Sequence, residues 1–199
     1  LSEQAIDRVV DNKAAASGQR VEALALRGRN EKTRWRSQFA SATGLEERRA
    51  AAMNLSLRQS FQAYRDAFRE DLNHFWSGLA ALQMGTIFSE LSREGSAWKD
   101  SFESNDEADD YRRKLEQDLA ALRVIVTASV AGALLRLAPK DEGRAWADVS
   151  KADALFLTAE KARVVAAYDV VKKQTPFVMD AARGQLELFA QLGVRADIA

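Results

Sequence analysis

Histidine is the first residue type to examine for catalytic or metal chemistry, and this 199-residue chain has only one, His74. The chain has no cysteine, so a metal would have to rest on His74 and on carboxylates such as Glu70, four residues before it. A serine nucleophile would likewise depend on His74 as its general base. A polar residue at the start of a helix explains His74 more simply. We therefore predict no catalytic residue, no metal and no cofactor.

A second group with oxygen ligands is the acidic run at residues 103–110, Glu-Ser-Asn-Asp-Glu-Ala-Asp-Asp. Such side chains suit calcium, but the run lacks the glycine and the terminal bidentate glutamate of a calcium loop. Acidic side chains also stabilise the first turn of a helix through its dipole. We interpret the run as a solvated loop that leads into a long helix.

Basic side chains gather between residues 20 and 49, where eight Lys and Arg accompany four acids. Lys32 and Arg36 are four residues apart, so they share one edge of a helix, and two arginines before them extend the positive region. We predict that these side chains bind an acidic segment of a protein partner or of a neighbouring domain of the same chain. The alternative is a solvated face. The predicted residues are Arg27, Arg29, Lys32 and Arg36.

Composition limits the other partner classes. The 29 Lys and Arg equal the 29 Asp and Glu, whereas nucleic-acid binding proteins normally carry a basic excess. The longest charge-free apolar run, Val124–Leu135, is shorter than the roughly 20 residues that span a membrane. We expect a cytoplasmic protein that binds neither nucleic acid nor membranes. Because the chain begins at Leu1, we also expect it to be a piece of a longer protein.

Nearly the whole chain is expected to be helical, because it has few glycines and prolines and its apolar residues recur at helical spacing. Gly28 is expected to end one helix and Asn73 to cap another, with an interruption near Asn54. The apolar second half of the longest helix is expected to be buried. The expected helices cover about 2–11, 19–27, 31–40, 46–71, 73–91, 107–138, 145–157, 160–173 and 176–192.

Two segments reproduce the spacing of a tetratricopeptide-type second helix, which has a small residue, an aromatic, another small residue and then a proline. Small residues let two helices approach closely, and the aromatic fills the hole between neighbouring pairs. One segment has valines in place of the small residues: Val164, Tyr168, Val171 and Pro176. The other has leucine in place of the proline: Ser60, Tyr64, Ala67 and Leu72.

Three strings occur in order along the chain: Leu26–Lys32 (LRGRNEK), Tyr64–Phe68 (YRDAF) and Phe75–Leu82 (FWSGLAAL). Together they resemble the tetratricopeptide-like, TRAF-binding domain of apoptosis signal-regulating kinases, and related bacterial tetratricopeptide proteins, over about residues 20–190. The chain departs from that family at Gly78-Leu79-Ala80, where the family has Gly-Ile-Asn. The resemblance implies a helical scaffold within a larger signalling protein and supplies no catalytic residues.

We therefore predict an all-α, tetratricopeptide-like α-α solenoid of antiparallel helix pairs in a right-handed superhelical stack, as a single domain over residues 1–199. The predicted function is a non-catalytic protein- or domain-binding scaffold in a signalling or stress-response protein. Its concave surface would be lined by helices such as Asn73–Leu91 and Ala145–Leu157. The alternative is a regulatory or sensor module that binds a small ligand and controls an attached enzymatic domain. A deep pocket with convergent Arg and Tyr side chains would favour that alternative.

Overall fold

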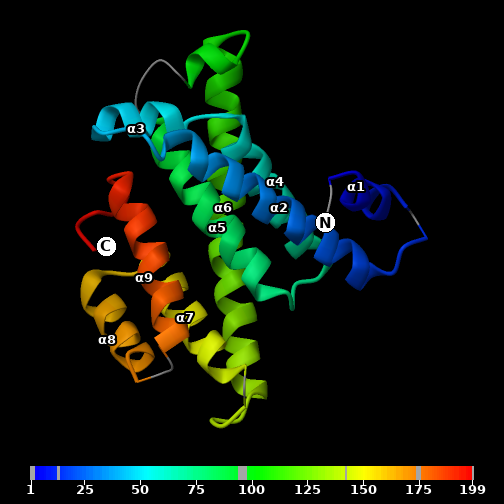
Figure 1. Ribbon diagram of the computed structural model, residues 1–199, viewed down its shortest axis with the longest axis vertical. Helices are drawn as coiled ribbons and strands as arrows, with labels where there is room; N and C mark the ends of the chain where they lie inside the picture. The colour runs from blue at the N-terminus through cyan, green and yellow to red at the C-terminus, as the bar shows by residue number, and fades with distance from the viewer. Residues whose placement is uncertain (1–2, 13, 94–97, 142, 174–175, 199) are drawn as a thin grey trace. The chain divides into compact units, whose positions relative to one another are not determined.

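The computed structural model describes residues 3–12, 14–93, 98–141, 143–173 and 176–198, apart from the side chains of Ser101 and Pro176. These residues form nine α-helices and one short 3-10 helix, and none of them lies in a strand (Figure 1). The prediction of an all-α helical fold is confirmed.

The chain divides into two compact units, Leu1–Leu122 and Arg123–Ala199, and the boundary falls inside α6 (Asn105–Arg136). We predicted a single domain over residues 1–199. The division into two compact units does not test that prediction, which stays a prediction. Besides the first part of α6, the first unit holds α1 (Glu3–Asp11), α2 (Ser17–Phe39), α3 (Leu45–Ala52), α4 (Leu55–Glu70), α5 (Phe75–Ser92) and the 3-10 helix Lys99–Ser101. Besides the rest of α6, the second unit holds α7 (Arg144–Thr158), α8 (Lys161–Val171) and α9 (Pro176–Gln191).

Helix α2 runs without a break through Gly28, so the predicted helix end at this residue was wrong. Gly28 is buried against the ring of Tyr64 from α4, and a Cβ on Gly28 would lie only 2.7 Å from the Tyr64 Cγ. The Ser60 hydroxyl donates a hydrogen bond to the Gly28 carbonyl oxygen at 2.9 Å. Glycine therefore serves here for close approach of α2 and α4, not for a turn.

Helix α4 packs against both α2 and α5 in the first unit. Its start confirms the predicted interruption, because the Asn54 side chain accepts hydrogen bonds from the N–H groups of Ser56 and Leu57. The predicted cap at Asn73 was wrong: its own N–H donates to the Asp71 carboxylate at 2.8 Å, and α5 begins at Phe75. The Asp71 carboxylate thus accepts a backbone hydrogen bond in the turn between α4 and α5.

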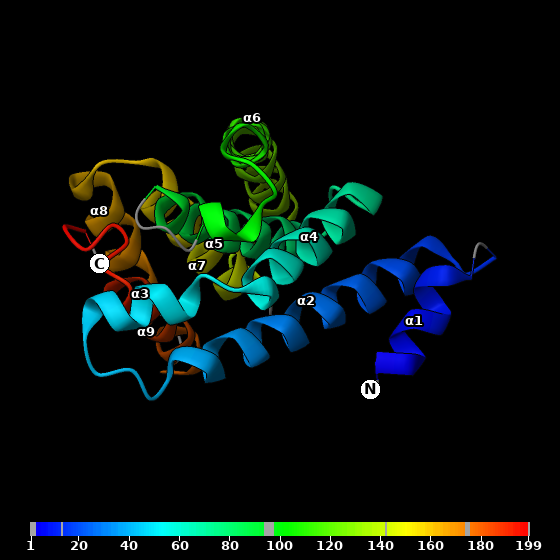
Figure 2. The ribbon, with the colours of Figure 1, turned by 90° about the horizontal axis from the view of Figure 1, so that it is seen from above.

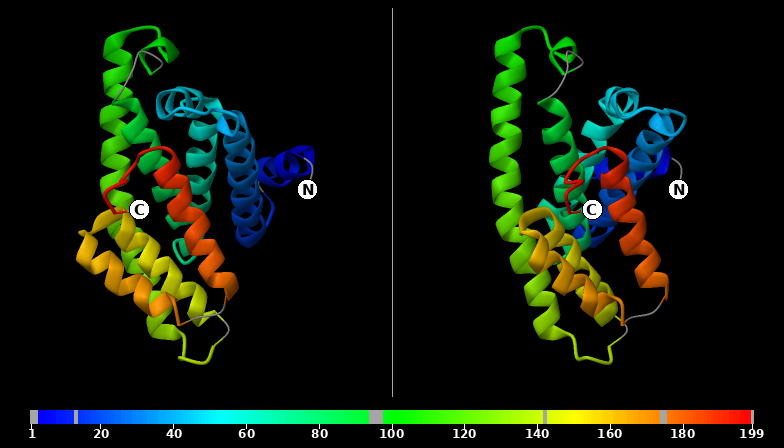
Figure 3. Two further views of the ribbon diagram at one scale, coloured as in Figure 1. Left: turned by 60° about the vertical axis from the view of Figure 1, so that its left-hand side comes forward. Right: turned by 90° about the vertical axis from the view of Figure 1, so that its left-hand side faces the viewer.

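In the second unit α7 packs against α8 and against α9, as both views of Figure 3 show. The three helices begin and end within a few residues of the predicted bounds. Tyr168 of α8 packs beside their shared apolar core, and its hydroxyl donates to the Asp153 carboxylate of α7 at 2.6 Å. The buried members of this core are Val149, Ala152, Val171, Val178 and Ala182.

The second half of α6 is not buried all round, so the expectation of a deeply buried segment was wrong. Val124 and Leu135 are 71% and 89% exposed, while Val126 and Val130 are buried on another side of the helix. By length and composition alone, α6 could cross a membrane. In the structure, 28% of its apolar window is buried. Its charge-free stretch, residues 124–135, is about 18 Å long, against about 30 Å for a bilayer core. The absence of membrane binding stays a prediction.

Candidate functional site

The continuous course of α2 divides the four predicted basic residues between two sides of the helix. Arg27 and Arg36 are nine residues apart, which is about two and a half turns, so they lie on opposite sides. Arg29 and Arg36 are seven residues apart, about two turns, and Lys32 lies between them on the same side. We call Arg29, Lys32 and Arg36 the basic edge. Arg29 and Arg36 are exposed, and Lys32 is half-buried.

The opposite side of α2 carries α1, which lies beside the N-terminal end of α2 and oblique to it in Figure 2. Arg27 Nη2 lies 2.7 Å from Asp7 Oδ1, and Arg34 pairs with Glu3. The two acids are one turn apart on α1 and the two arginines about two turns apart on α2, so α1 runs antiparallel to α2. Ile6 of α1 is buried at 2% exposure. An acidic amphipathic helix is therefore already held on one basic side of α2.

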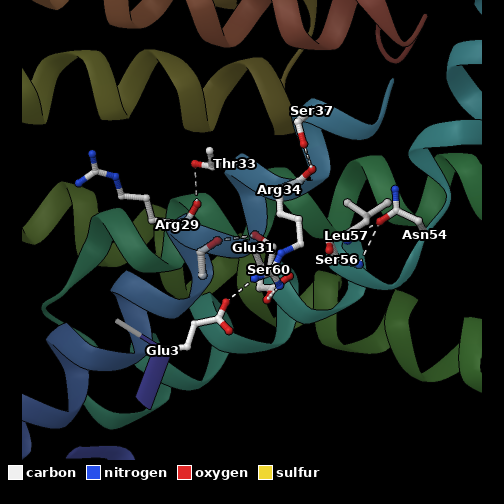
Figure 4. A network of polar contacts seen from close by, with 11 residues as sticks. Glu3, Arg29, Glu31, Thr33, Arg34, Ser37, Asn54, Ser56, Leu57 and Ser60 are labelled. Carbon is white, nitrogen blue, oxygen red and sulfur yellow. Dashed lines mark hydrogen bonds and ion pairs between the residues drawn. The ribbon is translucent and has the colours of Figure 1, made fainter. Parts of the chain in front are cut away.

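Glu31 joins this ion-pair network from the buried side of α2 (Figure 4). One of its carboxylate oxygens accepts a hydrogen bond from Arg34, which also donates to Glu3. The hydrogen bond to Glu3 and the negative charge of Glu31 raise the pKa of Arg34, which therefore stays charged. The other oxygen, Glu31 Oε2, is buried and has no hydrogen-bond partner among the described residues.

A pocket of about 430 Å³ lies beside Glu31, between α1, α2 and α4. Most of its lining side chains are carboxylates or amides, and a single guanidinium group is among them. The lining residues are Glu3, Ile6, Asp7, Asp11, Arg27, Asn30, Glu31 and Gln59.

Tyr64 lies behind the basic edge, against Gly28. Its burial raises the pKa of the phenol to about 12, although the positive charge of Arg29 acts in the opposite direction. The phenol is therefore neutral at physiological pH. Tyr64 supports the packing of α2 on α4 and is no acid or base for chemistry near neutral pH.

His74 makes side-chain contacts at the start of α5, and its Nε2 also lies 3.4 Å from Glu22 Oε1 of α2. Its Nδ1 lies 2.8 Å from the Ser77 Oγ, and its Nε2 accepts a hydrogen bond from the Trp76 indole N–H at 2.7 Å. Ser77 is only 1% exposed, so a substrate could not reach its hydroxyl. In the described part of the chain, no three His, Asp or Glu side chains are placed to hold a metal ion.

The expectation that the helix over residues 73–91 lines a binding surface stays a prediction, and the first unit covers one side of this helix. Gly78 of α5 packs against the ring of Phe68 from α4, and Gly85 packs against Leu119 of α6. The two glycines are seven residues, about two turns, apart, so these contacts cover one side of α5.

Residues 2–85 match the model of the family Tetratricopeptide Repeats-Sensor. This segment runs from α1 into α5 and contains the Gly28–Tyr64 contact. It is similar to a tetratricopeptide-like repeat domain. A search of curated proteins and a search of solved structures gave no match.

The sequence analysis placed only Lys32 and Arg36 on one helix, with Arg27 and Arg29 before it, and it missed the roles of Glu31 and Arg34. The signal was present in the spacing. Glu3 and Asp7 are four residues apart, and Arg27 and Arg34 are seven apart, which is the pattern of two facing helices with opposite charges. The predicted break at Gly28 hid this pattern, because it assigned Arg27 and Arg34 to different helices.

Proposed function

We propose that this chain is a non-catalytic binding module of a larger signalling or stress-response protein, akin to the TRAF-binding domain of apoptosis signal-regulating kinases. Its basic edge binds an acidic segment of a protein partner or of a neighbouring domain. The match to a tetratricopeptide-type family over residues 2–85 supports a binding role. We further propose that it acts in the cytoplasm and binds neither nucleic acid nor membranes, in keeping with its net charge of zero.

One observation carries this proposal: the docking of α1 on α2. Arg27 and Arg34, seven residues apart, already hold two acids of a helix. Arg29 and Arg36 repeat that seven-residue spacing on the other side of α2 and are both exposed. An acidic helix of a partner can therefore meet the basic edge with the geometry that α1 uses. Charges at the rim of an interface mainly set the association rate and its salt dependence.

The test compares the chain with the double variant Arg29→Glu and Arg36→Glu as bait for partner capture, with the captured proteins identified. The matched control, Lys172→Glu with Arg183→Glu, makes the same charge change on two exposed residues, one directly after α8 and one in α9. We expect the basic-edge variant to lose partners at low salt that the control retains, and its melting temperature to change little because the sites are exposed. Equal recovery of every partner by both variants would contradict the proposal.

A second candidate function is a regulatory or sensor module that binds a small ligand and controls an attached enzymatic domain. The description of the matched family, Tetratricopeptide Repeats-Sensor, favours it. The pocket of about 430 Å³ between α1, α2 and α4 offers space for such a ligand, but its described lining has one arginine and no tyrosine instead of the convergent Arg and Tyr side chains expected for this alternative.

A further inference from the structure

One face of α2 binds α1. Its residues recur at spacings of three and four along α2, as on one side of a helix. Arg27 and Arg34 of this face pair with Asp7 and Glu3 of α1. We call it the α1-binding face, and its residues are Ala23, Leu26, Arg27, Asn30, Glu31 and Arg34.

Helix α1 is held weakly on this face. It has nine residues, fewer than the roughly 12–15 that an isolated helix needs to be stable in water. All nine are described, and Ile6 alone among them is buried. The four side chains of the two ion pairs are at least 36% exposed, and ion pairs between exposed side chains contribute little to stability. A segment with so few buried contacts opens locally at a small cost in free energy.

Helix α1 also leaves space beside it. A pocket of about 650 Å³ lies between α1 and α2. Ala5 and Val9, one turn apart on α1, line it on one side, and Ala23 and Leu26 of α2 line it on the other. Larger apolar side chains in place of Ala5 and Val9 would bury more apolar surface in this pocket. Another helix can therefore fill the α1-binding face better than α1 does.

We propose that the α1-binding face is an exchangeable helix-binding surface, whose partner is an acidic amphipathic helix of another protein. The partner displaces α1 and places an apolar residue where Ile6 lies. Its acids take the places of Glu3 and Asp7 and pair with the two arginines of the face. A second copy of the chain would bring only the same α1, which fills the pocket no better. This surface is additional to the basic edge, which lies on the other side of α2.

Fluorescence anisotropy of a labelled peptide titrated with the whole chain tests the proposal. The peptide has the sequence of residues 3–12 with Ala5→Leu and Val9→Leu. Two variants of the chain release α1: Ile6→Asp puts a charge at its buried contact, and Asp7→Arg turns an exposed ion pair into a repulsion. We expect both release variants to bind the peptide with a Kd below about 1 mM. The unmodified chain should bind it about fivefold or more weakly, because its own α1 competes for the face.

Charge reversal tests whether the partner helix is recognised in the way that α1 is. Arg27→Glu in the chain should weaken binding of the peptide about tenfold, because the peptide's Asp7 then meets a like charge. A peptide that also carries Asp7→Arg should bind this variant as tightly as the first peptide binds the release variants, which a misfolded chain could not do. The control Lys172→Glu makes the same charge change on an exposed residue outside the first unit and should bind as the unmodified chain does.

No saturable binding to either release variant below about 1 mM would overturn the proposal. Equally tight binding to the release variants and the unmodified chain, or no recovery with the charge-reversed peptide, would also overturn it. Light scattering that shows a dimer of the unmodified chain, abolished by Ile6→Asp, would assign the face to α1 of a second copy and so contradict the proposal. Failure of basic-edge capture would leave all these results unaffected, because that edge lies on the other side of α2.

Discussion

The helix pairs α2–α4 and α7–α8, one in each unit, place an aromatic residue at the same repeat position but surround it differently. Tyr64 of α4 rests on Gly28, which has no side chain to separate the helices. Tyr168 of α8 packs beside an apolar core and donates its hydroxyl hydrogen to the buried Asp153. The repeat pattern thus specifies the position of the aromatic residue. The facing helix determines whether close packing or a hydrogen bond stabilises it.

Replacing either tyrosine by alanine is the largest test of this comparison. Removing a fully buried aromatic side chain typically costs about 3–5 kcal/mol. Tyr64 and Tyr168 are half-buried, so Tyr64→Ala and Tyr168→Ala should each lower the free energy of unfolding by about 2–4 kcal/mol. Chemical denaturation of both variants measures it. A loss below about 1 kcal/mol for one of them, as at a surface site, would show that this tyrosine does not fill the repeat position.

Alanine in place of glycine should act in opposite directions in the two units. A Cβ on Gly28 would lie within 3.0 Å of three atoms of the Tyr64 ring, so we expect Gly28→Ala to destabilise the chain by about 1–3 kcal/mol. Gly184 of α9 has open space around it, and Gly184→Ala should stabilise by about 0.5–1 kcal/mol through helix propensity. Thermal unfolding distinguishes the two signs. A stable Gly28→Ala protein would mean that α2 and α4 do not need their close approach.

Removing only the hydroxyl group should have a different effect on stability at each of the two tyrosines. Tyr168→Phe removes the 2.6 Å hydrogen bond that Asp153 accepts from the Tyr168 hydroxyl and should cost about 1–3 kcal/mol. Tyr64→Phe keeps the ring against Gly28 and should change the free energy of unfolding by less than about 0.5 kcal/mol. Denaturant titration of both variants measures the difference. Equal losses would contradict the contrast between shape and hydrogen bonding.

Alkaline pH tests the burial of the Tyr64 phenol. Burial raises the pKa of Tyr64 to about 12, whereas an unfolded tyrosine ionises near pH 10. Between these values the folded state keeps a proton that the unfolded state loses, so stability falls as the pH rises from about 10 to 12. The pKa of Tyr168 is also raised, by burial and by the charge of Asp153. Tyr64→Phe should lose less stability over this range than the unmodified chain, and an unchanged pH profile would contradict the burial of the phenol.

The sequence is sufficient to predict the helical class, the α7–α9 bounds and the interruption near Asn54, because these follow from local periodicity and turn chemistry. The continuity of α2 could not be predicted, because whether Gly28 ends a helix or receives a ring depends on Tyr64, more than thirty residues away. The same long-range contact decides which side of α2 each basic residue occupies. The burial of Glu31 and its unpartnered oxygen also depend on tertiary contacts with α1 and α4, which no local pattern encodes.

The proposed binding role of the basic edge is tested most directly by amide NMR spectra of the chain titrated with a hexaglutamate peptide. We predict saturable shifts centred on Arg29 to Arg36 of α2 that weaken as salt rises through about 0.1 M, where screening reaches about 10 Å. The double variant Arg29→Glu and Arg36→Glu should lose these shifts, and the control Lys172→Glu with Arg183→Glu should keep them. Shifts of equal size in the second unit, or shifts that persist in the basic-edge variant, would contradict the account.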